Sequence, residues 1–240
     1  GEVLLTQCRA IGFQKGDQKL AERLPDVLTS DKAGHLVFIS DVFQDLYRYN
    51  RRARRFWRTH FYLYGQLLDK YLKPDKIYYN TFITRPYIDF ASKKDSGHWF
   101  KHMKDIWKDR DVIFIEGEKS RLGVGNDLFN NVKSIRRILG PPRDAFDKYD
   151  EILATAQKYE KDALFLIALG PTATVLAYDL FNAGFQVMDV GHVYIEYEWY
   201  RMGAKRKVKV ERKYVNESPD GQQVSDAGEE YYNQIVDIIK

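Results

Sequence analysis

The chain has 240 residues, of which 44% are hydrophobic and 30% are charged, and its formal net charge is +4. This mixture suits a globular protein with a sizeable core, and it excludes a disordered chain, a collagen-like repeat and a disulfide-stapled miniprotein. The positive excess permits a phosphate-bearing ligand but is too small to imply nucleic acid.

The cysteine content and the hydropathy pattern both bear on the cellular compartment in which the chain is expected. Cys8 is the single cysteine, so no intrachain disulfide can form, and a buried thiol in a reducing cytosol is expected. No apolar run approaches the ~20 residues of a membrane span. A cytoplasmic chain is therefore predicted.

Short apolar runs alternate with amphipathic stretches along the chain. In chain order, the pattern first predicts a helix over 20–28, a strand over 36–39, a helix over 51–71 and a strand over 77–79. A strand over 112–115, a helix face from 128 to 139 and a helix over 144–159 are predicted next. A strand over 164–169, a helix from 171 to Gly184 and a strand over 186–188 follow. The polar stretch 204–226 is expected to form a hairpin or a mobile loop, and 232–239 is expected to close the chain as a helix.

Strands that alternate with helices predict an α/β fold with a mostly parallel sheet and helices on both faces. Ligands of such sheets bind beyond the carboxyl ends of the strands. The polar residues that follow the predicted strands there include carboxylates, an imidazole and two arginines, a set that suits a metal-chelated phosphate ligand. They are Asp41, Asn80, Thr81, Arg85, Glu116, Glu118, Arg121, Gly170, Thr172, Asp189 and His192.

Three of these segments carry distinct chemistry. Gly170-Pro171-Thr172 joins a strand to a helix, where Thr172 could cap the helix and leave backbone N–H groups for an anion, or could be an ordinary cap. The loop 116–127 brings Glu116, Glu118 and Arg121 together with three glycines but matches neither a phosphate-binding loop nor a dinucleotide fingerprint, and it could also be a solvated loop. His192 beside Asp189 suits Mn²⁺ or another divalent ion, or is a structural histidine.

The run Arg51 to Arg58 is basic and aromatic. It could contact nucleic acid, but it is better explained as the polar face of an amphipathic helix.

Several longer motifs then carry a family resemblance: Ile115-Glu116-Gly117-Glu118 with Ser120 to Phe129, Leu169 to Ala177, and Asp189-Val190-Gly191-His192 with Glu196 to Trp199. With Thr84 to Tyr87 and Ile11 to Gln14, they resemble the GT-D-fold glycosyltransferases, a family once known only as a domain of unknown function. The likeness extends from Gly1 to about Trp199.

The resemblance implies a Rossmann-like GT-D fold over one domain, 1–240, which is either truncated at the N-terminus or excised from a larger protein. It implies a metal-dependent transfer of a sugar, expected to be glucose, from a UDP-sugar to a glycan on a serine-rich repeat adhesin, with Mn²⁺ or Mg²⁺. The family's metal motif ends in Gly-Glu, so Glu2 inherits a metal role beside His192, and an Asp is expected ahead of Gly1.

For the donor, the predicted contacts are Arg85, Glu116, Glu118, Arg121, Gly170 and Thr172. If the enzyme inverts the anomeric configuration, Asp41, Asp189 and Glu196 are the candidates for the base that deprotonates the acceptor, and the sequence does not choose among them. Two alternatives stay open, a nucleotide-cofactor oxidoreductase on a Rossmann-like fold and a non-enzymatic sugar-binding module.

Overall fold

The computed structural model describes residues 2–42, 45–215, 217–218 and 221–240. Its strands are β1 (Phe38–Ile39), β2 (Tyr79–Asn80), β3 (Asp111–Gly117), β4 (Ser134–Gly140), β5 (Leu164–Ala168), β6 (Gln186–Asp189) and β7 (Ile235–Ile238). Its helices are α1 (Glu2–Leu5), α2 (Gln18–Thr29), α3 (Arg51–Tyr71), α4 (Ser96–Trp107), α5 (Tyr149–Ala156), α6 (Pro171–Asn182), α7 (Val193–Arg201) and α8 (Glu229–Asn233), with 3₁₀ turns η1 (Thr81–Thr84) and η2 (Ala145–Lys148).

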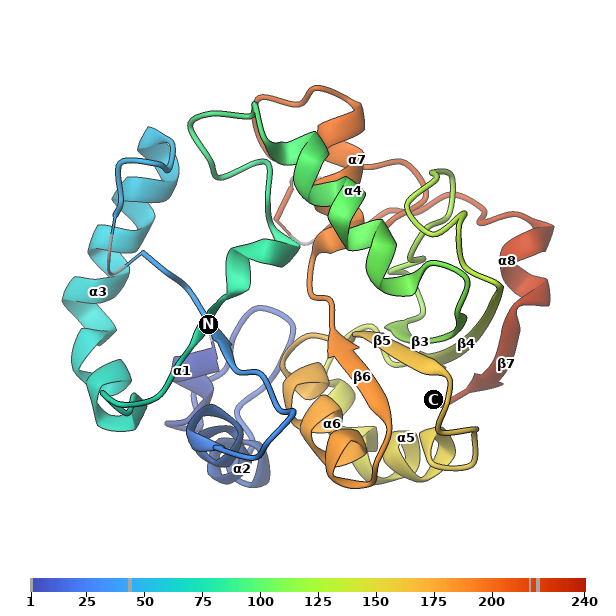
Figure 1. The fold of residues 1–240 in the computed structure, drawn as a ribbon, viewed down its shortest axis with the longest axis horizontal. Coiled ribbons are helices and arrows are strands. Elements are labelled where there is room, and N and C mark those ends of the chain that lie inside the picture. The colour runs from blue at the N-terminus through green and yellow to red at the C-terminus, as the bar shows by residue number, and fades with distance from the viewer. Residues whose placement is uncertain (1, 43–44, 216, 219–220) are drawn as a thin grey trace.

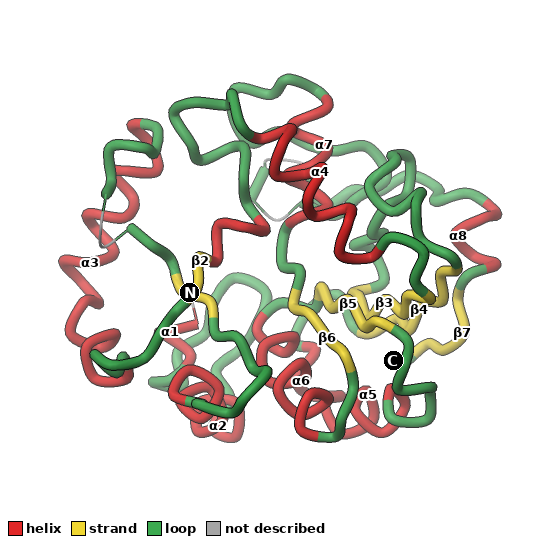
Figure 2. Tube along the Cα trace, viewed as in Figure 1, coloured by secondary structure: helices red, strands yellow, loops and turns green. Residues whose placement is uncertain are grey.

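Five strands form one parallel sheet in the order β6-β5-β3-β4-β7, and β1 and β2 form a separate parallel pair (Figure 2). Along β3, alternate residues enter two different cores. Ile113 and Ile115 pack with α2, α5 and α6, whereas Val112 and Phe114 pack with α4 and α7. Figure 1 shows these two groups of helices on opposite sides of the sheet, which confirms the predicted α/β architecture.

The strand order creates a switch point between β3 and β5. The chain leaves β3 over the α4 and α7 face to reach β4, and it leaves β5 through α6 on the other face to reach β6. Because the two connections diverge, the carboxyl ends of β3 and β5 leave a crevice between them, where open α/β sheets bind ligands.

Two predicted helices are strands in the structure. Residues 134–140, expected as part of a helix face, form the strand β4 between β3 and β7, and the predicted closing helix becomes α8 followed by β7. The helix was predicted because apolar residues recur at helical spacing, at Leu128, Val132, Ile135 and Leu139. In the structure Arg137 lies in the strand, and its side chain is only 2% exposed because it pairs with Glu116. A charged residue at a fully buried strand position hides the strand from a hydropathy pattern.

Smaller differences concern lengths and loops. The predicted helix 144–159 is divided into η2 and α5, helices α4 and α7 were not foreseen, and Cys8 is exposed rather than buried. The described residues of 204–226 contain no helix or strand, although they include Val210 and Val215, which are buried against the α4 and α7 core. In the described part of the chain, no helix is both long and apolar enough to cross a bilayer.

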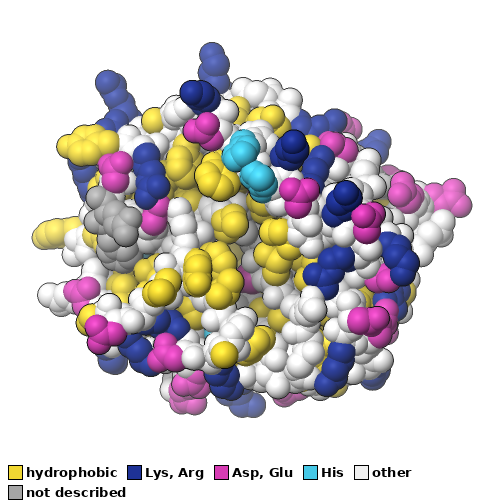
Figure 3. All heavy atoms as spheres, in the orientation of Figure 1, with side chains coloured by type: hydrophobic (Ala, Val, Ile, Leu, Met, Phe, Trp, Pro, Cys, Tyr) yellow, Lys and Arg dark blue, Asp and Glu magenta, His cyan; other side chains and the backbone are white. Residues whose placement is uncertain are grey.

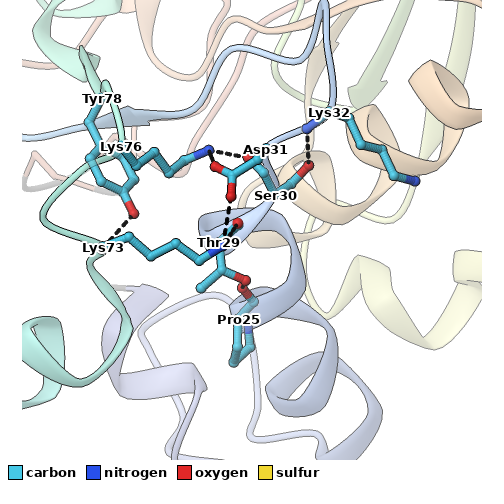
Figure 4. A network of polar contacts seen from close by, with 8 residues as sticks. All are labelled: Pro25, Thr29, Ser30, Asp31, Lys32, Lys73, Lys76 and Tyr78. Carbon is cyan, nitrogen blue, oxygen red and sulfur yellow. Dashed lines mark hydrogen bonds and ion pairs between the residues drawn. The ribbon is translucent and has the colours of Figure 1, made fainter.

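A lysine network holds the small β1 and β2 pair in place. Lys73 Nζ, just after α3, donates to Thr29 O at the end of α2 and to Asp31 Oδ2, both at 2.8 Å, and Lys76 Nζ lies 3.1 Å from Asp31 Oδ1 (Figure 4). These contacts join the segment before β2 to the segment before β1. They therefore help to hold in place the residues that follow the two short strands.

Candidate active site at the carboxyl edge of the sheet

The loop after β6 meets the segment that follows β2. Gly191, after β6, approaches η1 so closely that a Cβ there would lie 3.4 Å from Thr84 Oγ1. The residue after Thr84 is Arg85, so the short β2 strand delivers an arginine to the edge of the main sheet. This edge is the candidate site.

Arg85, Glu217 and Lys207 form the central charged group. Arg85 donates to both oxygens of Glu217, at 3.2 and 3.4 Å, and Lys207 Nζ lies 3.0 Å from Glu217 Oε2. Their side chains are 20–26% exposed, so the group is only partly open to solvent. Burial opposes ionisation of Glu217, but the charges of Arg85 and Lys207 outweigh it and lower its pKa to about 2.

Burial and neighbouring charges also have opposite effects on the pKa of Arg85. Burial disfavours the charge of Arg85, but the carboxylates of Glu217 and Glu196 outweigh it and raise the pKa of Arg85. Two cations therefore surround one carboxylate. This arrangement leaves positive potential for an anionic ligand at the crevice.

His192 precedes α7 and lies against this group. Burial, reinforced by the charge of Arg85, lowers the pKa of its imidazole to about 3. The ring is therefore neutral near pH 7, which is the form that can bind a metal ion. Its Nδ1 atom is buried, and no hydrogen-bond partner for it is found among the described residues.

Glu196 lies one turn further along α7 and is fully buried. Its Oε2 accepts from the backbone N–H groups of Tyr87 and Ile88, at 3.1 and 2.9 Å. Burial raises the pKa of Glu196 to about 7, although Arg85 and these hydrogen bonds oppose the rise. Glu196 thus ties α7 to the chain just after Arg85, where it positions that arginine.

Glu116 and Arg121, predicted as donor contacts, are engaged inside the protein. Glu116 is fully buried, pairs with Arg137 and accepts from Leu122 N at 2.7 Å. Arg121 donates to the carbonyl oxygens of Arg212, at 2.9 Å, and of Ser225. These contacts favour a role in holding the β3 loop and the 204–226 segment, and ligand contact by either residue stays a prediction.

The turn after β5 was expected to be capped by Thr172. In the structure Gly170 is the N-cap of α6, and Thr172 is the second residue of the helix. Thr172 is fully buried, and its Oγ1 has no hydrogen-bond partner among the described residues. The N-terminus of α6 nevertheless opens at the β5 edge, where its dipole favours an anion.

The remaining carboxylates lie in different environments. Asp189 is exposed at the end of β6 and accepts from Gly191 N at 3.0 Å and from Thr174 Oγ1 at 3.2 Å. Asp41 follows β1 and is held by Arg48, by Tyr49 and by Asn80, with 2.8 Å to the Asn80 Nδ2. Glu118 is exposed after β3.

Comparison with known proteins identifies the family. A family model described as "Glycosyltransferase GT-D fold" matches residues 1–218. The chain belongs to the GT-D-fold glycosyltransferases. A solved structure of the domain of unknown function 1792, described as having a distinct glycosyltransferase fold, superposes with a TM-score of 0.94 and 42% identity, covering 100% of this chain and 87% of that one.

Streptococcal relatives agree with this assignment. "A New Glycosyltransferase (DUF1792) from Streptococcus sanguinis" superposes with a TM-score of 0.95 and 36% identity, over 100% of this chain and 90% of that one. "Probable glycosyl transferase Gly" of Streptococcus gordonii and "Glycosyltransferase GlyD" of Streptococcus pneumoniae serotype 4 (strain ATCC BAA-334 / TIGR4) are each 40% identical over 98% of this chain. The chain spans 35% and 29% of the lengths of these two proteins, about a third in each case.

A divalent metal site in this GT-D chain is not assembled by the described residues alone. They contain no group of three or more His, Cys, Asp or Glu side chains placed to hold a metal ion. His192 Nδ1 is one available donor, and the side chain of Glu2, the second predicted ligand, lies outside what the structure describes. The described side chains therefore do not fit a complete metal site, and no chemical step is assigned to a metal.

Sequence reasoning missed Lys207, Glu217 and the buried Tyr194, which the structure adds to the GT-D site. Burial raises the pKa of Tyr194, and its hydroxyl interacts with Ser120 of the β3 loop. Lys207 and Glu217 come from the polar 204–226 segment, which is far in sequence from the end of any predicted strand. The alternation of charges in that segment marked it as polar but gave no signal for where it packs.

Proposed function

We propose that this chain transfers a sugar, glucose in the first instance, from a UDP-sugar to a glycan on a serine-rich repeat glycoprotein in the cytoplasm. The observation that carries the proposal is the Arg85–Glu217–Lys207 group beside His192, at the carboxyl edge of a GT-D sheet. Cations at this crevice suit a nucleoside diphosphate, and family membership supports sugar transfer as the reaction.

In the proposed reaction, the bond between the sugar C1 and the diphosphate oxygen breaks, and its electron pair leaves with UDP. A bond forms between C1 and an acceptor hydroxyl oxygen, whose proton passes to a base. Arg85, Lys207 and the α6 N-terminus would stabilise the charge that develops on the diphosphate.

Asp189 is the base that this proposal favours if the configuration inverts. It is exposed at the end of β6, whereas Glu196 is fully buried and the Asp41 side chain is only 14% exposed. A base must reach the acceptor hydroxyl, so exposure at the ligand edge decides among the three.

An aromatic pair supports a sugar acceptor. Phe38 and Tyr79 are register partners across β1 and β2, are 39% and 42% exposed, and have ring centroids 5.4 Å apart. Exposed aromatic rings offer the flat apolar faces that sugar rings contact. On the face in Figure 3, hydrophobic side chains gather toward the middle and Lys and Arg side chains lie mostly toward the rim, so that face offers no continuous basic surface for nucleic acid.

Metal dependence is also proposed, with Mn²⁺ or Mg²⁺ as the ion. Its support is a neutral donor, Nδ1 of His192, together with the resemblance that gives Glu2 a metal role. A metal bound with UDP would neutralise diphosphate charge. Replacing His192 by Ala is expected to abolish the Mn²⁺ enhancement of UDP affinity, and an unchanged Mn²⁺ titration would remove His192 from the site.

Calorimetry tests the donor part of the proposal, with Arg85→Gln as the variant and exposed Arg55→Gln as the matched control. We expect UDP to bind the wild type, and Arg85→Gln to weaken binding by about 1.5–3 kcal/mol, the range for hydrogen bonds to charged groups. Arg55→Gln should leave the affinity unchanged. Binding of NAD in preference to UDP would instead favour the oxidoreductase alternative.

A further inference from the structure

Helix α3 places a long unpartnered face at the edge of the molecule (Figure 1). Its inner side, with Ala53, Trp57 and Phe61, packs in a small core with Tyr49 and Phe82. On the outer side Phe56, Tyr62 and Leu63 are 58%, 89% and 55% exposed. Large apolar side chains of this kind, on a face that nothing in the described chain covers, suggest contact with something outside the protein.

Five arginines share the N-terminal half of this helix: Arg51, Arg52, Arg54, Arg55 and Arg58. No salt bridge joins any of them to a carboxylate of the described residues, and the first turn of α3 holds no acidic residue. Four of them, with Thr59, line an open groove of about 460 Å³: Arg51, Arg54, Arg55 and Arg58. The groove is therefore strongly cationic.

This cluster does not stabilise its own helix. The N-terminus of a helix carries partial positive charge, so cations there are unfavourable. The pairs Arg51 with Arg55 and Arg54 with Arg58 are four residues apart, a spacing at which like charges repel. Helix stability therefore does not explain the arginines, and an external anion does.

The outer residues also have a regular geometry. Arg51, Arg55, Arg58 and Tyr62 follow one another at spacings of four, three and four residues, which places them in one row along the helix. Arg52 and Phe56 lie in the adjacent row. We call these six residues the arginine face.

We propose that the arginine face of α3 binds the phosphate headgroups of an anionic lipid surface. Guanidinium groups bind phosphate oxygens through paired hydrogen bonds, and exposed Phe, Tyr and Leu side chains enter the region between headgroups and acyl chains. The aliphatic Leu63 beside the aromatic residues favours lipid over nucleic acid, whose bases stack on aromatic rings. This surface is independent of the proposed sugar transfer.

Sedimentation with vesicles tests the proposal. The 240-residue chain should bind vesicles of phosphatidylglycerol mixed with phosphatidylcholine, should not bind pure phosphatidylcholine, and should bind less as salt rises above about 0.15 M. The variant Arg51→Gln/Arg55→Gln/Arg58→Gln should lose at least tenfold in affinity. The variant Phe56→Gln/Tyr62→Gln should also bind more weakly, because it removes the apolar contacts and keeps every charge.

A matched control removes three exposed lysines elsewhere: Lys101→Gln/Lys108→Gln/Lys158→Gln. It changes the net charge equally and should retain binding. The arginine variant should also melt at the same or a higher temperature than the wild type, since repulsion within α3 is relieved. This result would exclude unfolding as the cause of lost binding.

Three outcomes would overturn the proposal. Equal losses in the arginine variant and the lysine control would indicate nonspecific charge attraction. Binding to a duplex oligonucleotide with none to anionic vesicles would assign the face to nucleic acid. Complete competition by inorganic phosphate at millimolar concentration would indicate a site for a free anion rather than for a membrane.

Discussion

Folding changes the protonation of Glu196 strongly. Its pKa is about 7 in the folded chain, against an ordinary value of 4.5, and burial is the main cause. A carboxyl whose pKa is raised on folding contributes stability below its unfolded pKa, and this contribution is lost as the pH rises through the folded pKa. The relevant window is therefore between about pH 4.5 and pH 7.

The variant Glu196→Gln removes this titration but keeps an oxygen for the N–H groups of Tyr87 and Ile88. Relative to Glu196→Gln, the wild type should lose up to about 3 kcal/mol of unfolding free energy across the window, at about 1.4 kcal/mol per pH unit. Urea unfolding at several pH values measures the difference. Parallel stability curves for the two proteins would contradict the assigned pKa.

Gly170 occupies a backbone conformation that only glycine adopts readily, with φ at 57° and ψ at −147°. A Cβ there would also lie 2.5 Å from Cε2 of Phe13. Gly170→Ala should therefore destabilise the chain by about 1–3 kcal/mol. Adding Phe13→Ala would relieve the contact but not the backbone strain. In thermal unfolding, we therefore expect the double variant to be more stable than Gly170→Ala and less stable than Phe13→Ala alone. Wild-type stability of Gly170→Ala would refute this explanation.

At the residue scale, the sequence predicts which polar residues follow strands better than it predicts their contacts. His192, Arg85 and Asp189 were predicted because each follows a predicted strand, and their functional roles stay predictions. Glu116 and Arg121 were found by the same rule, yet their side chains turn inward to Arg137 and to the 204–226 segment. Strand ends can be predicted locally, but the direction of a side chain depends on partners far away in the sequence.

Among the elements, the described part of the 204–226 segment is held to the sheet edge by hydrogen bonds, an ion pair and the burial of Val210 and Val215. Arg121, in the β3 loop, donates to two of its carbonyl oxygens, and Lys213 is buried with its Nζ 3.1 Å from Glu198 Oε1. The segment in turn delivers Lys207 and Glu217 to Arg85. Loss of the Arg121 anchor should therefore affect both stability and ligand binding.

Arg121→Ala should lower the unfolding free energy by about 1.5–3 kcal/mol, because the hydrogen bonds from its charged side chain to two backbone carbonyl groups are lost. Limited proteolysis should then cleave within 204–226 faster than in the wild type. Chemical denaturation and mass spectrometry of the fragments provide the two measurements. Unchanged stability together with weaker UDP binding would instead make Arg121 a direct ligand contact.

The elements also show where pattern reading succeeds. Helix α3 was predicted with its observed limits because its apolar stripe is long and regular. The strand β4 was missed because Arg136 and Arg137 interrupt its apolar run, and the edge strand β7 reads equally well as the last turn of a helix. Pairing with Glu116, which makes a buried Arg137 tolerable, is a tertiary fact that no local window contains.

For the whole molecule, the parallel sheet follows from the alternation of strands and helices, whereas its switch point is known only from the observed strand order, and comparison with known proteins confirms the GT-D family. The single-domain organisation over 1–240 stays a prediction. The charged side chains of the molecule gather in two regions. The site combines cations with buried carboxylates at the sheet edge. The arginine face of α3, in contrast, has no described carboxylate partner. The molecule therefore has two cationic regions, for which we propose two different phosphate ligands.

The most direct test of the central proposal measures UDP released from UDP-glucose by the natural full-length protein, with a glycopeptide acceptor and Mn²⁺ present. We predict release that depends on the acceptor and that falls by about 10²–10⁴-fold in Asp189→Asn, the contribution of a general base, while UDP affinity is retained. Absence of UDP release from UDP-glucose and from other UDP-sugars would contradict sugar transfer from a UDP donor. Full activity of Asp189→Asn would contradict the role of Asp189 while leaving the transfer itself in place.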